Sequence, residues 1–134
     1  MDLKDFTPKS EVVTVEVLHP ATLEPLVNKD KTPMTIELYA PYSKQYKSAQ
    51  HEQQNKRLQR AQKARKGGFS ISSEELEKEG VELLAKVTKA WNVTYEGESP
   101  ELSVKKAVEV YTELFWLVEQ INEAMADVVD FTKS

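Results

Sequence analysis

The chain has 134 residues, of which 40% are hydrophobic and 30% are charged, with a net charge of −4 and no cysteine. This size and composition are typical of one globular domain with its own core, which we expect over residues 1–134. Without cysteine there can be no disulfide framework, no thiolate zinc site and no cysteine nucleophile. The sequence has no apolar run of the roughly 20 residues that would span a bilayer, and its polar start does not resemble a signal peptide.

The N-terminal third predicts a loose end followed by a β-hairpin. Residues 1–10 contain few large apolar groups and are expected to form a loose tail. Residues 13–18 and 34–39 are rich in β-branched side chains and alternate in polarity, which predicts two strands joined by a polar connection. A lone hairpin is only marginally stable in water, so we expect the hairpin, residues 11–41, to pack its apolar face on helices.

Residues 43–66 predict a basic helix with Ser43 as its N-cap. The segment 44–66 lacks glycine and proline, and it holds eight lysines and arginines against one acid. Residues 67–134, in contrast, hold six basic and fourteen acidic side chains. Because the apolar stripe of the basic helix is thin, we expect this helix to be exposed or only lightly packed, and to end at the glycine pair that follows Lys66.

The remaining part, residues 72–131, is expected to be helical. Ser72 and Glu75 form a capping box, after which apolar residues recur at helical spacing as far as Trp91. A short helix capped by Ser103 and a final helix from about Glu113 follow. The predicted fold is therefore α+β and mainly α, with an N-terminal β-hairpin packed on three or four helices.

The helix after Ser72 carries two further expectations, one for its polar side and one for its apolar side. Its carboxylates fall on the solvent side of the amphipathic pattern: Glu74, Glu75, Glu77, Glu79 and Glu82. Its apolar side is expected to be largely buried: Leu83, Leu84, Val87 and Trp91.

The sequence contains no constellation typical of an enzyme, a metal site or a cofactor site. His19 and His51 match no metal-ligand spacing, and the pair Gly67-Gly68 has neither the Walker nor the dinucleotide-binding spacing. We therefore predict a protein that is not an enzyme, with no catalytic residue, no metal and no cofactor.

The basic helix leaves two interpretations open. Eight cations could neutralise phosphates, which would make residues 44–66 the contact of a small cytoplasmic nucleic-acid-binding or regulatory module. The lack of interleaved aromatic residues and a pI of about 5.3 speak against it. Alternatively the acidic helix folds back on the basic one, or the basic helix binds an acidic partner helix, from a client or a neighbouring copy. The candidate residues for partner binding are Lys56, Arg57, Arg60 and Lys63.

The order of several short segments resembles that of the tail assembly chaperones of long-tailed, siphovirus-type bacteriophages. In the N-terminal half the resemblance lies in residues 14–26 and 35–43. In the C-terminal half it lies in residues 69–75, 91–93, 102–111 and 116–121, and in Phe131. The chain departs from the family by a longer polar insert at residues 28–32, and by Phe115 where a helix-breaking proline is expected.

The resemblance implies a non-enzymatic protein in the cytoplasm of the infected bacterium that is absent from the mature virion. Such a chaperone binds the long helical tape-measure protein and promotes assembly of the tail tube around it. The family typically also makes a C-terminally extended form by ribosomal frameshifting, which brings in the tail-tube protein. The implied partners are thus these two proteins and further copies of the chain in a larger coat. No membrane is expected as a partner, and the charge pattern speaks against nucleic acid as one.

Overall fold

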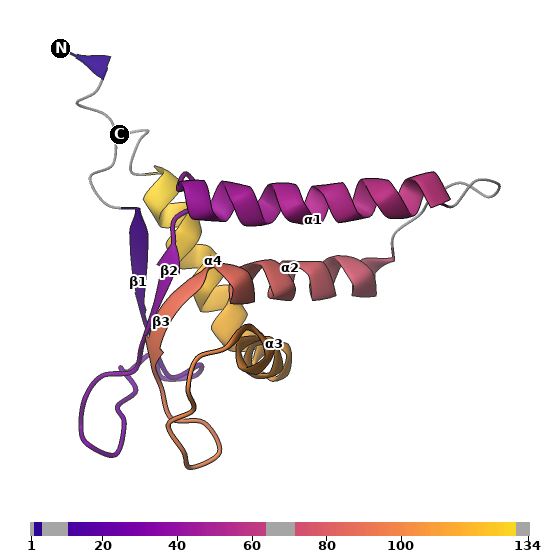
Figure 1. The fold of residues 1–134 in the computed structure, drawn as a ribbon. Coiled ribbons are helices and arrows are strands. Elements are labelled where there is room, and N and C mark those ends of the chain that lie inside the picture. The colour runs from indigo at the N-terminus through magenta and orange to yellow at the C-terminus, as the bar shows by residue number, and fades with distance from the viewer. Residues whose placement is uncertain (1, 4–10, 64–71, 131–134) are drawn as a thin grey trace.

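The computed structural model describes residues 2–3, 11–63 and 72–130 of the chain. The described part contains four helices beside a three-stranded antiparallel sheet (Figure 1), which confirms the predicted α+β, mainly α class. Most of the tail over residues 1–10, the pair Gly67-Gly68 and Phe131 lie outside the described residues. The elements, in chain order, are β1 (Val12–Glu16), β2 (Thr35–Tyr39), α1 (Lys44–Lys63), α2 (Ser73–Val87), β3 (Thr88–Asn92), α3 (Val104–Glu113) and α4 (Phe115–Asp130).

The predicted hairpin forms the first two strands of the sheet. β1 and β2 pair antiparallel with Val13 opposite Leu38 and Val15 opposite Ile36. These four side chains are all buried, because alternate residues of a strand point to the same face. That face is covered by helices, as expected for a hairpin that is too small to be stable alone.

The third strand corrects the expected course of the chain after Ser72. The helix stops at Val87 instead of continuing through Trp91, and residues 88–92 form β3, which pairs with the free edge of β2. β2 thereby becomes the central strand and its backbone groups on both sides are used. Of the side chains expected to be largely buried, Leu84 and Val87 are buried, whereas Leu83 and Trp91 are only partly buried.

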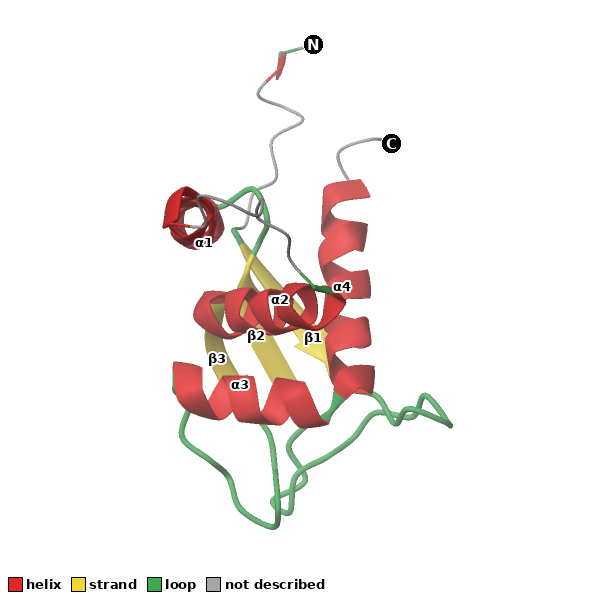
Figure 2. Ribbon diagram, turned by 90° about the vertical axis from the view of Figure 1, so that its right-hand side faces the viewer, coloured by secondary structure: helices red, strands yellow, loops and turns green. Residues whose placement is uncertain are grey.

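The helices surround the sheet unequally. α2 and α3 lie in front of one sheet face and α4 packs against β1, while α1 stands on the far side of α2 from α3 (Figure 2). Tyr111 on α3 and Ile121 on α4 are both fully buried and pack in the common core. The predicted caps are confirmed, since each serine hydroxyl accepts a hydrogen bond from the backbone N–H three residues later: Ser43, Ser72 and Ser103.

The two long loops lie at the end of the sheet away from α1 (Figure 1) and are tied to each other. The polar insert at residues 28–32 is anchored by Asn28, which is only 8% exposed. Its amide donates to the carbonyl of Asn92 at 3.3 Å, and its oxygen accepts from the Thr94 hydroxyl at 2.6 Å. Elsewhere, Gln120 on α4 exchanges two hydrogen bonds with the backbone of Leu18, which fixes the start of the first loop to that helix.

Candidate functional site

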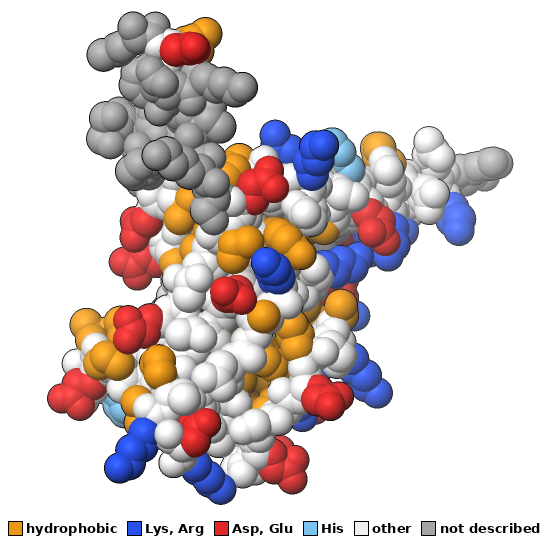
Figure 3. Space-filling model, turned by 60° about the vertical axis from the view of Figure 1, so that its left-hand side comes forward, with side chains coloured by type: hydrophobic (Ala, Val, Ile, Leu, Met, Phe, Trp, Pro, Cys, Tyr) orange, Lys and Arg blue, Asp and Glu red, His pale blue; other side chains and the backbone are white. Residues whose placement is uncertain are grey.

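The basic helix α1 projects from the body of the protein. Figure 3 shows Lys and Arg side chains along its length at the top of the view. Within Lys44–Lys63 no residue is buried, which agrees with the expectation of an exposed or lightly packed helix. Tyr46 and Ala49 in its first half are partly buried against the core, whereas Leu58 in its second half is 61% exposed.

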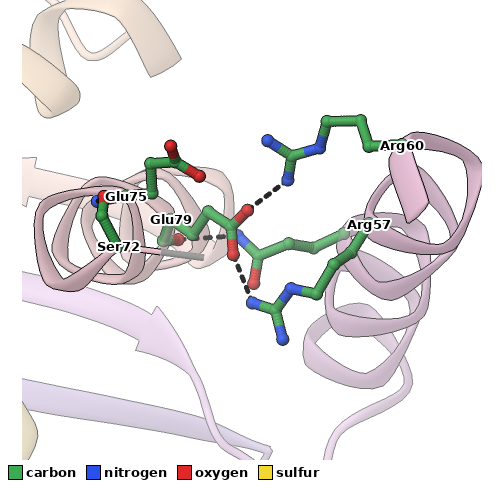
Figure 4. Close-up of polar contacts among 6 residues, drawn as sticks. Arg57, Arg60, Ser72, Glu75 and Glu79 are labelled. Atoms are coloured by element: carbon green, nitrogen blue, oxygen red, sulfur yellow. Dashed lines mark hydrogen bonds and ion pairs between the residues drawn. The ribbon is translucent and has the colours of Figure 1, made fainter. Parts of the chain in front are cut away.

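Two of the four predicted partner-binding residues are engaged within the chain. Arg57 and Arg60 each form an ion pair with Glu79 on α2, one with each carboxylate oxygen (Figure 4). Gln53, one turn earlier on α1, donates to the backbone carbonyl of Glu79 at 2.7 Å. We call these four residues the Glu79 clasp. It joins the outer half of α1 to the N-terminal half of α2, so the acidic helix does fold back on the basic one.

The clasp corrects the expectation that Glu79 faces solvent. The residue is 7% exposed, because α1 covers the side of α2 on which it lies. The hydrogen bond from Arg57 lowers the pKa of the Glu79 carboxyl, and that from Arg60 adds to the effect, while the removal of water by burial opposes it. A buried carboxylate with two guanidinium partners remains charged near neutral pH.

The other two predicted residues have different surroundings. Lys56 forms an ion pair with Glu52 at 3.6 Å on its own helix, with both side chains largely exposed. Lys63 lines a polar cleft between α1 and α2 together with Lys56 and Arg60. The four cations are therefore near one another, but only Arg57 and Arg60 point into the clasp.

A second candidate site lies between α2, α3 and the start of α4. It is an open groove of about 650 Å³, which we call the α2–α4 groove. Sequence reasoning did not identify it, although Phe115 had stood out as an unexpected residue in this region. That phenylalanine is 70% exposed and forms part of the apolar lining. Four of the apolar side chains that line the groove form what we call its floor: Val81, Leu84, Phe115 and Val118.

The charges around the α2–α4 groove are mainly acidic. Among the described residues that line it, Glu74, Glu77 and Glu119 are acidic and Lys78 is the basic one. The acidic residues lie within the first part of α2 and the first part of α4, the two helices that also carry the apolar floor. An apolar floor beside carboxylates favours an amphipathic ligand that carries basic residues beside its apolar face.

Gly80 lies in the α2–α4 groove and in the middle of α2. Glycine inside a helix is less favourable than alanine by about 1 kcal/mol. A Cβ atom built at this position would meet nothing within 4 Å, so packing within the chain does not require glycine here. The missing side chain leaves the helix backbone open to the groove, which permits close approach of a ligand.

Other kinds of site were sought in the described part of the chain. It contains no group of three or more His, Cys, Asp or Glu residues that could hold a metal ion. No helix in it is long and apolar enough to cross a membrane. Comparisons with protein-family models, with curated protein sequences and with solved structures found no match for this chain.

Proposed function

We propose that this protein is a non-enzymatic tail assembly chaperone of a long-tailed bacteriophage. In this proposal it holds the tape-measure protein in the cytoplasm of the infected bacterium, promotes assembly of the tail tube and is absent from the finished virion. The order of short segments resembles that of this family over most of the chain, and this resemblance supports the proposed family. The observation that carries the holding function is the α2–α4 groove, which has an apolar floor and an acidic rim.

The groove suits a helical client for three reasons. Amphipathic helices bind by laying apolar residues spaced three or four apart into an apolar groove. Phe115, exposed at one side, offers a large apolar contact to such a helix, and Gly80 leaves room for its backbone or small side chains. The acidic rim would then select clients whose apolar stripe is flanked by lysine and arginine.

The further partners follow from the same proposal. A C-terminally extended form of the chain would recruit the tail-tube protein to the held client. The alternative, a nucleic-acid contact through residues 44–66, has less support, because Arg57 and Arg60 are already bound to Glu79. Only the remaining cations of α1 would be free to contact phosphates without opening the clasp.

The proposal is tested by co-expressing the chain with the tape-measure protein of the same phage. We expect the wild type to keep that protein soluble and to co-purify with it. Phe115→Asp places a charge in the apolar floor and should reduce co-purification at least tenfold. The matched control is Leu23→Asp, the same kind of change at an exposed leucine outside the groove, which should leave capture intact.

Two results would count against the proposal or its site. A tape-measure protein that is equally insoluble with and without the chain would contradict the holding function. Capture that survives Phe115→Asp but is lost with reversal of Lys56 and Lys63 would contradict the groove as the contact and move it to α1. Salt-sensitive binding of RNA or DNA by the wild type at physiological ionic strength would favour the nucleic-acid alternative.

A further inference from the structure

We infer that the α2–α4 groove of one copy also receives the outer half of α1 from a second copy. The outer half is residues 54–63, and its exposed anchor is Leu58. The contact goes beyond the proposed function, because it requires no client and would exist in the purified protein. It rests on three observations: an exposed leucine on a helix without buried residues, a groove of opposite charge, and the positions of the two within one chain.

The outer half of α1 is held within its own chain by the polar Glu79 clasp and not by apolar packing. Most of the stability of a protein helix comes from tertiary packing of its apolar face, and no residue of Lys44–Lys63 is buried. Leu58 and Ala61, with Gln54 and Arg57 beside them, line a shallow hollow of about 370 Å³ on the helix surface. Leu58 is 61% exposed there. An apolar patch on a projecting helix is suited to a partner groove.

The charges of the two surfaces are complementary. Residues 54–63 hold four cations and no acid. Glu79 already binds Arg57 and Arg60, so Lys56 and Lys63 are the cations left to face the groove of a second copy. The described lining of the groove holds three carboxylates against Lys78. Opposite net charges attract over roughly a Debye length of 8–10 Å and steer the encounter, while the apolar residues form the contact itself. Gly80 removes the side chain that would otherwise hold an incoming helix away from α2.

The two surfaces cannot meet within one chain. α1 lies on one side of α2 and α3 lies on the other, and the start of α4, which completes the groove, lies next to α3 (Figure 2). The Glu79 clasp holds α1 in that position. The α1 helix that enters a groove therefore comes from another copy. Since the donor and acceptor surfaces differ, the contact can repeat into a ring or an open chain, or it can close as a pair in which each copy inserts α1 into the other's groove.

The inference predicts concentration-dependent assembly of the purified chain. Sedimentation velocity of the wild type, from about 1 to 100 μM, should show species larger than the monomer. Leu58→Asp and Phe115→Asp should each weaken assembly at least tenfold, whereas Leu23→Asp should assemble like the wild type. Circular dichroism and thermal midpoints check that each variant is folded. Arg57 and Arg60 are left unchanged, because they belong to the clasp.

Mixing the two defective variants gives the decisive test. Leu58→Asp retains an intact groove and Phe115→Asp retains an intact α1, so their mixture should form heterodimers and nothing larger. A mixture that stays monomeric, a wild type that is monomeric at about 100 μM, or assembly in both single variants would overturn the inference. Leu58→Asp also separates the two proposals, since it should lose self-association while its free groove still captures the tape-measure protein.

Discussion

Replacing Glu79 by glutamine removes the charge that two arginines of α1 bind, while it keeps the size and shape of the side chain. Breaking a fully buried ion pair by removing one partner costs about 3–5 kcal/mol. The clasp is less enclosed, because the side chains of Arg57 and Arg60 are 37% and 49% exposed, so water can solvate them when the carboxylate is gone. We therefore expect a loss of about 1–2 kcal/mol in the free energy that holds α1 against α2.

Hydrogen exchange measured by mass spectrometry can locate this loss. Because α1 has no buried residue, we expect it to open without unfolding of the sheet. A loss of 1–2 kcal/mol corresponds to roughly 5–30-fold faster exchange, confined to the outer half of α1, with β2 and α4 unchanged. The control is Glu75→Gln, an exposed carboxylate one turn earlier on α2, which should leave exchange in α1 as in the wild type.

The effect should also depend on pH. The pKa of Glu79 is lowered from its ordinary 4.5, chiefly by the hydrogen bond from Arg57. A carboxyl with a lowered pKa in the folded state stabilises it at higher pH, and this contribution is lost as the pH falls below the ordinary value and through the folded-state pKa. The difference between the wild type and Glu79→Gln should thus be full near neutrality and shrink in acid. Equal exchange in both proteins at neutral pH would refute the clasp as the attachment of α1.

Three further predictions concern other parts of the molecule. Gly80→Ala should raise the free energy of unfolding by about 0.5–1 kcal/mol in urea titrations, because a Cβ there meets nothing within 4 Å; a decrease would mean that the groove is narrower than described. Asn28→Ala should lower the free energy of unfolding by about 1–3 kcal/mol, since it leaves the Thr94 hydroxyl and neighbouring loop groups without their partner, and an unchanged urea midpoint would contradict the loop network. Burial raises the pKa of Tyr111 from 10.0 to about 12, against a smaller opposing effect of its hydrogen bond with Thr88. The stability that this tyrosine contributes should be present below pH 10 and lost as the pH rises through about 12. Ultraviolet titration of a variant with Tyr46→Phe and Tyr95→Phe should show one late tyrosine. Both substitutions are needed, because burial also raises the pKa of Tyr46 and the hydrogen bond to Glu113 raises the pKa of Tyr95 to about 12.

Local features of the sequence were sufficient for most of the elements. Ser43, Ser72 and Ser103 cap helices because a serine hydroxyl meets a backbone N–H only three residues away. The hairpin register follows from the alternation of Val13 and Val15 on one strand. β3 was missed because Ala90 and Trp91 continue the helical spacing of α2, so the same residues satisfy both patterns. These residues form a strand because their backbone pairs with the otherwise free edge of β2.

The candidate sites depended more on the fold. Phe115 drew notice in the sequence as an unexpected residue, yet the sequence around it did not indicate a groove, because the opposite wall comes from α2, about 30 residues earlier in the chain. The cations of α1 were found by counting charges. Which of these cations bind Glu79 and which face outward could be seen only once α2, about 20 residues further along the chain, was placed beside α1.

The sequence by itself determined the segregation of charge, the caps, the two strands of the hairpin and the amphipathic helices, since each of these depends on the types and spacing of residues within one segment of the chain. Only the tertiary structure decided that Glu79 is buried, that residues 88–92 form a strand, and that the α2–α4 groove stays open. The physical reason is that periodicity gives the direction of a side chain relative to its own helix or strand. Whether that direction leads to water, to a guanidinium or to a neighbouring strand is set by segments distant in the chain.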